Sequence, residues 1–182
     1  MPPSAHRSAI AHLKRVDPVL GEIIDRVGPC RLEARRTGTH YDALVRSIVF
    51  QQLSGKAAGT IHRRFTELYT GKRPRAEHVL VTEESAMRGA GLSRQKIGYL
   101  RDLSARVADR SLPLAHLGRL PDDEIIDHLV QVKGIGRWTV QMFLMFRLGR
   151  PDVLRIGEKW RPYASIASWY LWRSLENGDG QA

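Results

Sequence analysis

The sequence predicts an all-α protein, and three observations lead to this fold class. Apolar residues recur at helical spacing in one segment after another. Most of these segments start at Asp, Ser, Thr or Pro and several stop at Gly, as helices commonly do. No segment alternates apolar and polar residues for long enough to predict a strand. We therefore expect one compact helical domain with two lobes, covering residues 1–182.

The N-terminal half is predicted to contain a capped helix and then a helical hairpin. Asp17 and Pro18 form a good N-cap and first turn for a helix that Gly28 ends. Leucine, isoleucine and other apolar residues at helical spacing then predict helices at 41–53 and 55–69. The short connection between these two helices predicts that they pack side by side.

Each of the later helices is predicted from its start signal. A basic turn at 71–75 ends the helical hairpin. Thr, Ser and Pro then start the helices that we expect at 82–89, 93–109 and 121–130.

The charge balance predicts a polyanionic partner. Lys and Arg number 29 against 19 Asp and Glu, which gives a net charge of +10. DNA or RNA is the first candidate partner, and an anionic membrane surface is the second. The longest apolar runs are much shorter than the ~20 residues that a membrane span needs, and the N-terminus lacks the apolar region of a signal peptide. We expect an intracellular protein, in the cytoplasm with the nucleoid, without a membrane partner.

The metal-binding residue types show no metal-site pattern. Cys30 is the only cysteine, which excludes an intrachain disulfide, a multi-cysteine zinc site and an iron–sulfur cluster. The seven histidines are not spaced to place two ligands on one helix face. We expect no metal and no cofactor.

The sharpest local motif is a glycine turn within a helical hairpin at about 121–148. Residues 129–139 have the sequence LVQVKGIGRWT, in which Gly134 and Gly136 flank an apolar residue that anchors the turn. Glycines let the backbone reverse and approach a partner closely, and exposed amides beside basic side chains suit a DNA phosphate. The alternative is an ordinary helix–turn–helix connection, and the basic composition favours the phosphate interpretation. The expected phosphate-binding residues are Lys133, Gly134, Gly136, Arg137 and Thr139.

Four segments together resemble a known family. They are QQLS at 51–54, GLSRQK at 91–96, the hairpin turn at 133–139, and the stretch from WRPY at 160–163 to WYLW at 169–172. In this order they resemble the 3-methyladenine DNA glycosylase II family of the helix-hairpin-helix superfamily, from about residue 17 to residue 173. The resemblance implies a monofunctional base-excision protein that flips alkylated purines out of double-stranded DNA. We expect it to act as a monomer.

The resemblance also implies individual site residues. Trp138 stands where lyase-active relatives have a nucleophilic lysine, which argues against lyase chemistry. Trp138, Met142 and Trp172 match positions that line the base pocket, and Gln52 matches the wedge that fills the gap left by the flipped nucleotide. Indole faces suit this pocket because N-alkylated purines are cationic. The other two tryptophans, 160 and 169, are expected to be core residues.

The resemblance fails at the segment that carries the catalytic acid. In the family, a stretch like 149–154 is followed by a Pro-x-Asp segment, whose Asp stabilises the developing oxocarbenium ion, and by further helices. Here Leu154 is followed directly by residues 155–160, which resemble the end of that region. The catalytic residue is therefore unknown. Asp152 and Glu158 are the candidate substitutes, although we expect both to be solvated surface acids.

Three functions remain open at this point. The first is an active or formerly active glycosylase, and the second is a non-catalytic DNA-binding or damage-sensing protein. The third is a helical interaction module without a nucleic-acid partner. DNA binding that weakens steeply with salt would separate the third from the others, and base release would separate the first two.

Overall fold

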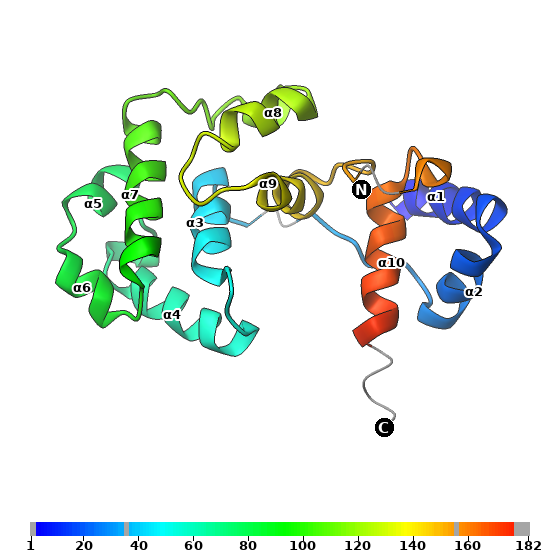
Figure 1. The fold of residues 1–182 in the computed structure, drawn as a ribbon, viewed down its shortest axis with the longest axis horizontal. Coiled ribbons are helices and arrows are strands. Elements are labelled where there is room, and N and C mark those ends of the chain that lie inside the picture. Colours follow the sequence, from blue (N-terminus) through cyan, green and yellow to red (C-terminus); the bar gives the residue numbers. More distant parts are fainter. Residues whose placement is uncertain (1–2, 35–36, 155–156, 177–182) are drawn as a thin grey trace. The chain divides into compact units, whose positions relative to one another are not determined.

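The computed structural model describes residues 3–34, 37–154 and 157–176. Within these ranges the regular structure consists of helices without any strand, which confirms the all-α prediction (Figure 1). The backbone contacts divide the chain into two compact units. Unit 1 comprises Met1–Arg36 and Leu144–Ala182, and unit 2 comprises Thr37–Phe143.

Unit 1 is a cluster of three helices. They are α1 (Pro3–Val16), α2 (Pro18–Val27) and α10 (Ala164–Glu176). Helix α2 contacts both α1 and α10. A π-helical turn at Leu144–Leu148 and a 3-10 turn at Glu158–Trp160 complete the unit.

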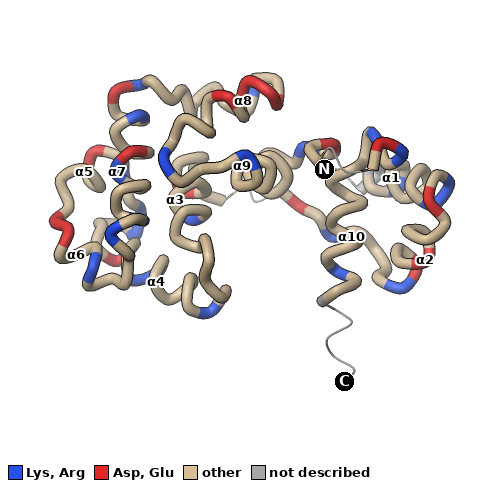
Figure 2. The backbone as a smooth tube through the Cα atoms, viewed as in Figure 1, with Lys and Arg blue, Asp and Glu red and all other residues tan. Residues whose placement is uncertain are grey.

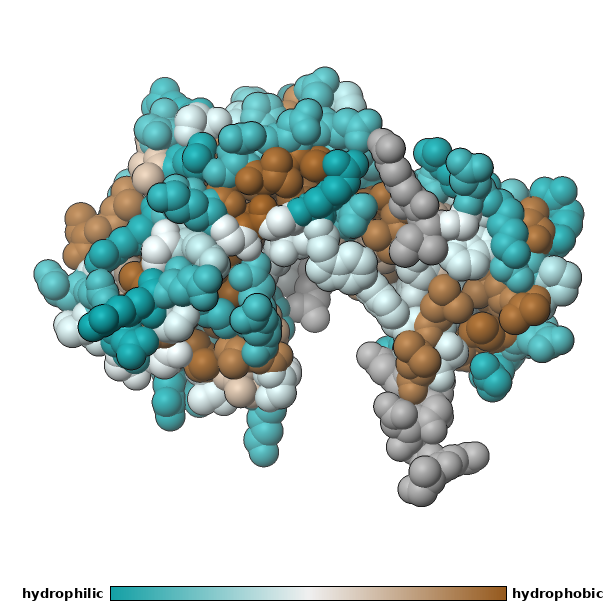
Figure 3. All heavy atoms as spheres, in the orientation of Figure 1, coloured by the Kyte–Doolittle hydropathy of each residue, from teal (hydrophilic) through white to brown (hydrophobic). Residues whose placement is uncertain are grey.

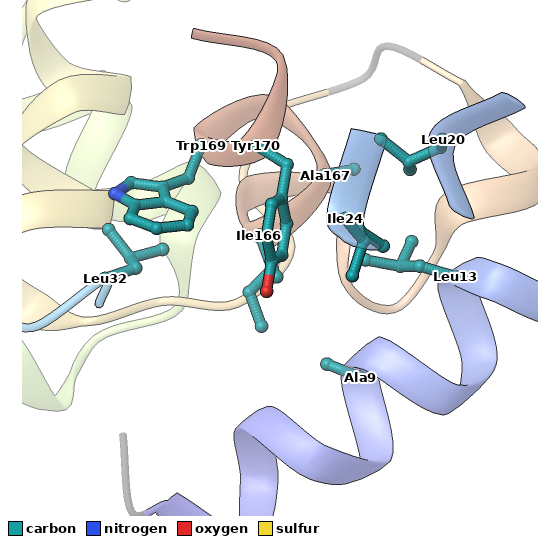
Figure 4. Close-up of a cluster of buried hydrophobic side chains, with 9 residues drawn as sticks. All are labelled: Ala9, Leu13, Leu20, Ile24, Leu32, Ile166, Ala167, Trp169 and Tyr170. Atoms are coloured by element: carbon teal, nitrogen blue, oxygen red, sulfur yellow. The ribbon is translucent and has the colours of Figure 1, made fainter. Parts of the chain in front are cut away.

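The core of unit 1 is formed by one apolar stripe from each helix (Figure 4). Leu13 of α1, Leu20 of α2 and Tyr170 of α10 are almost completely buried. Trp169 is also buried and contacts the Tyr170 ring edge-on, with a centroid distance of 4.9 Å. Trp169 therefore has the core role expected from the sequence. Figure 3 shows further apolar side chains on the surface of α2 and α10.

Asp17 joins the start of α2 to the 3-10 turn. Its carboxylate accepts hydrogen bonds from the backbone N–H of Leu20 at 3.1 Å and from Nε1 of Trp160 at 2.8 Å, and it pairs with Nζ of Lys159 at 3.0 Å. Burial alone would raise the pKa of this carboxyl, but the three donors outweigh burial and lower it. Trp160 therefore has a structural role, although it is half-buried and packs against the core instead of lying within it.

Unit 2 is built around α7. Its helices are α3 (His40–Phe50), α4 (Gly55–Glu67), α5 (Ala76–Val81), α6 (Glu84–Gly89), α7 (Arg94–Ala108), α8 (Asp122–Leu129) and α9 (Arg137–Phe143), with 3-10 turns at Thr70–Lys72 and Leu117–Arg119. Helix α7 contacts α3, α5 and α6, and α3 in turn contacts α4 and α9. The hydroxyl of Ser93 caps α7 by accepting from the N–H of Lys96 at 3.2 Å.

Two predicted boundaries in unit 2 are wrong. The helix expected to run to residue 53 ends at Phe50, because Gln51 has a ψ of +133° and Gln52 a φ of +57°, and neither angle belongs to a right-handed α-helix. Thr82 does not cap α6. It follows the last residue of α5 instead, and its hydroxyl donates to the carbonyl oxygen of His78 in that helix at 2.7 Å. Helix α5 itself was not expected, because six residues are too few to show a period.

Candidate nucleic-acid interface

The glycine turn connects two packed helices. Helices α8 and α9 contact each other, and the turn between them buries Val132 and Ile135. Lys133, Gly134 and Arg137 are exposed on the outside of the same turn. Figure 2 shows acidic residues on α8 and basic residues on the turn and the start of α9. The basic charge of the hairpin is therefore concentrated at its turn.

The two glycines of the turn serve different purposes. Gly134 has a φ of +79°, and a Cβ atom at this position would overlap the ring of Tyr99. At Gly136 the backbone is not left-handed, and a Cβ atom would meet nothing within 4 Å. The fold thus requires a glycine at 134 but not at 136. The bare backbone at Gly136 is open to an approaching group.

The loop that carries the predicted wedge is hydrogen-bonded to this turn. Gln52 is exposed between α3 and α4 in a left-handed conformation. The neighbouring Gln51 donates from Nε2 to the carbonyl oxygen of Gly134 at 2.8 Å. Gln51 was not among the predicted site residues, although it lies in the QQLS segment.

Helix α7 supports both the loop and the turn. The Lys96 ammonium donates to the carbonyl oxygens of Val49 at 2.6 Å and Gln51 at 2.8 Å, at the C-terminal end of α3. Burial lowers the pKa of this lysine. One helical turn and a half further on, Oδ2 of Asp102 accepts the N–H of Lys133 at 3.0 Å. Neither Lys96 nor Asp102 was among the site residues expected from the sequence.

The expected base-pocket residues are divided between the units. Trp138 and Met142 are four residues apart on α9 in unit 2, where Trp138 is 55% exposed and Met142 is half-buried. Trp172 belongs to α10 in unit 1 and stacks on Phe146, with a centroid distance of 6.0 Å and an interplanar angle of 21°. Thr139, the last expected phosphate ligand, is half-buried on α9.

The two candidate acids differ in environment. Asp152 is not the solvated acid that we expected, because its side chain is only 16% exposed and both of its oxygens are bonded. Oδ2 accepts from Nε of Arg161 at 2.8 Å, and Oδ1 accepts from the N–H of Ala164 at 3.2 Å, which is the first residue of α10. Glu158 is exposed, as expected. Residues 155 and 156, at the point where the family segment is missing, lie outside the described residues.

A family model described as "HhH-GPD superfamily base excision DNA repair protein" matches residues 45–161, which is more than half of the chain. The chain belongs to the HhH-GPD superfamily. This membership confirms the resemblance carried by the four sequence segments.

Individual members of this superfamily are similar over most of the chain. DNA-3-methyladenine glycosylase 1 of Schizosaccharomyces pombe is 30% identical over 198 aligned residues, with 92% of this chain and 87% of the relative covered. A solved structure of the S. pombe 3-methyladenine DNA glycosylase in complex with abasic DNA has a TM-score of 0.83, at 28% identity, over 93% of this chain and 97% of that one. A DNA-3-methyladenine glycosidase from Bacillus halodurans gives a TM-score of 0.82, at 30% identity, over 95% and 91% of the two chains.

The alignment with DNA-3-methyladenine glycosylase 1 of S. pombe is longer than this chain. It extends over 198 positions, whereas this chain has 182 residues in total. The S. pombe relative therefore has residues within the aligned region that have no counterpart here.

The described residues contain neither a cluster of metal ligands nor a helix suited to a membrane. His, Cys, Asp and Glu side chains in these ranges form no group of three or more that could hold a metal ion. None of the helices in the same ranges is both long enough and apolar enough to span a bilayer.

Proposed function

We propose that this protein binds double-stranded DNA at damaged bases and extrudes the damaged nucleotide, but excises it far more slowly than relatives that have the Pro-x-Asp segment. The observation that carries the DNA-binding part is the hairpin turn. Its backbone at Gly136 is open, and the exposed side chains of Lys133 and Arg137 flank it. This arrangement suits a phosphate, which is the sequence-independent part of DNA binding. The protein acts as a monomer on intracellular DNA.

The proposed target is an alkylated purine of the 3-methyladenine type. The named relatives are 3-methyladenine glycosylases, and the indole of Trp138 on α9 is 55% exposed, so a cationic base can stack on its exposed face. A cation–π contact of this kind contributes about 2 kcal/mol when it is desolvated. Met142 follows on the same helix, one turn after Trp138. Trp138 also takes the place of the lyase lysine, so strand cleavage is not part of the proposal.

Slow excision is proposed because the environments of the two candidate acids, Asp152 and Glu158, do not suit the reaction. Breaking the N-glycosidic bond develops positive charge on the sugar, and a fixed carboxylate must stabilise it. Both oxygens of Asp152 are engaged by Arg161 and by the start of α10, and Glu158 is exposed to solvent. The same observations favour the second function that the sequence left open, which is damage sensing without efficient chemistry. Membership of a base-excision superfamily argues against a helical interaction module.

Changing Gly136 to Asp is expected to weaken DNA binding by at least about 10-fold, which corresponds to about 1.4 kcal/mol. The new carboxylate would stand where a phosphate approaches, and the loss should be the same for every DNA sequence. The fold should be retained, because a Cβ atom at 136 would meet nothing within 4 Å and the backbone there is not left-handed. Fluorescence anisotropy with unrelated duplexes measures the effect.

The matched control is Gly136→Asn, which has the same shape without the charge. It should lose much less affinity than the Asp variant at low salt, and the difference should shrink as salt screens the charges. Equal and unchanged affinity in both folded variants would remove the turn from the interface.

Duplex DNA with an abasic analogue is expected to bind more tightly than intact duplex, by about 10-fold or more, since no base pair has to be opened. The solved S. pombe relative was captured with abasic DNA, which supports this choice of ligand. Changing Gln52 to Ala should reduce the preference without altering binding to intact duplex. Competition titrations with the two duplexes measure the ratio, and a ratio of one in the unmodified protein would contradict base extrusion.

A further inference from the structure

The side chain of Gln51 connects two parts of unit 2 that the proposed function uses separately. Its amide donates from Nε2 to the carbonyl oxygen of Gly134, in the turn proposed to bind phosphate. Its own backbone carbonyl accepts from Lys96, and the next residue in the chain is the proposed wedge, Gln52. Gln51 and Gly134 are 83 residues apart in sequence. One side chain therefore fixes the loop against the turn.

The loop is held in a conformation that it would not adopt alone. Gln52 has a φ of +57°, a left-handed conformation that is uncommon for residues other than glycine, asparagine and aspartate. Such a conformation persists only where the surroundings determine it. Lys96 supplies part of that determination, because it bonds the carbonyl oxygens of Val49 and Gln51 at the end of α3. The conformation of the wedge residue Gln52 thus depends on Lys96, which is far from it in the sequence.

The turn is fixed from the same helix. Asp102 of α7 accepts the N–H of Lys133, and the ring of Tyr99 fills the space in which a side chain on residue 134 would lie. Lys96, Tyr99 and Asp102 follow each other at intervals of three residues, so they share roughly one side of α7. Helix α7 therefore braces the loop through Lys96 and the turn through Tyr99 and Asp102. The side chain of Gln51 adds a direct hydrogen bond between the loop and the turn.

We infer that Gln51 is a positioning residue for nucleotide extrusion, which holds the wedge Gln52 at a fixed place relative to the phosphate-binding turn. This inference rests on the proposed function. A wedge acts on the base stack only if it is fixed relative to the backbone of the DNA that it enters, and the turn is the part that grips this backbone. Loss of the Gln51 amide should therefore remove the benefit of Gln52, while the grip on intact duplex stays.

The test is a double-mutant cycle read as the ratio of affinities for abasic and intact duplex. The proteins are the unmodified chain, Gln51→Met, Gln52→Ala and the double variant. Met has nearly the length of Gln but cannot donate to the Gly134 carbonyl. We expect Gln51→Met to lower the ratio by nearly the same factor as Gln52→Ala, and the double variant to show no further loss. Binding to intact duplex should change less than about twofold.

Gln131→Ala is the control, because Gln131 is an exposed glutamine of the same connection between α8 and α9. It should keep the full ratio. Thermal unfolding of every variant shows whether the fold is retained. A merely structural role for Gln51 would lower affinity for both duplexes together and leave the ratio unchanged, which would overturn the inference.

The cycle separates this inference from the proposed function. If the unmodified protein shows no preference for abasic duplex, the proposed extrusion and this inference are both overturned. If the preference exists and Gln52→Ala reduces it, but Gln51→Met keeps it, only the positioning role is overturned. Independent, multiplicative losses in the double variant would also contradict it.

Discussion

Inserting the family's Pro-x-Asp segment with its following helices after Leu154 is expected to raise the rate of alkylated-purine release by about 1,000-fold or more. A fixed carboxylate that stabilises the oxocarbenium ion by about 4 kcal/mol accounts for this factor, since each 1.36 kcal/mol changes the rate tenfold. Stacking on Trp138 cannot replace it, because stacking acts on the base in the ground state and the transition state alike. Single-turnover release from methylated duplex measures the rate.

The control for this insertion is the same segment with its Asp changed to Asn. It restores the missing helices without the charge, so the rate should fall back towards that of the unmodified chain. If the unmodified chain already turns over repeatedly, then Asp152→Asn and Glu158→Gln would identify the substitute acid. Unfolding of Asp152→Asn has to be measured in parallel, because Asp152 also bonds the first residue of α10.

Gly134→Ala is expected to destabilise the protein by about 2–4 kcal/mol, whereas Gly136→Ala should change the stability by less than about 1 kcal/mol. At 134 the new methyl group would overlap the Tyr99 ring, and the φ of +79° is unfavourable for alanine. At 136 the methyl group would enter open space. Denaturant unfolding of both variants measures the difference.

The two causes at Gly134 can be separated with Tyr99→Ala. In that background the overlap is relieved but the backbone strain is not, so Gly134→Ala should cost about 1–2 kcal/mol less than it does beside Tyr99. Equal costs for Gly134→Ala and Gly136→Ala in the unmodified chain would show that the turn does not have this geometry in solution.

Local signals predicted most of the helices and most of their ends, with the C-terminal end of α3 as the clearest exception. Asp17 and Ser93 are N-caps in the structure, and Gly28 ends α2, because capping depends on residues close in sequence. Helix α1 was not predicted, since few of its positions carry large apolar side chains and mainly Ala9 and Leu13 are buried. Secondary structure of that kind is decided by packing against α2, which a local pattern does not show.

The candidate site was predictable only where its motifs are continuous in sequence. The turn at 133–137 could be recognised, but the different roles of its two glycines depend on Tyr99, which comes from α7. The contacts of Gln51 and Lys96 join residues that are 83 and 45–47 positions apart. Such long-range contacts leave no periodic signal. Asp152 was expected in solvent because nothing in the local pattern indicates its partners at 161 and 164, which come after the point where the family segment is missing.

We expect this protein to occupy damaged DNA without efficient excision. One single-turnover experiment tests it, in which excess protein is mixed with duplex containing 3-methyladenine or 7-methylguanine and both bound DNA and abasic product are followed in the same samples. The DNA should be fully bound while abasic product forms at a rate close to that of spontaneous depurination. Complete conversion of the bound DNA to abasic product within minutes would contradict it.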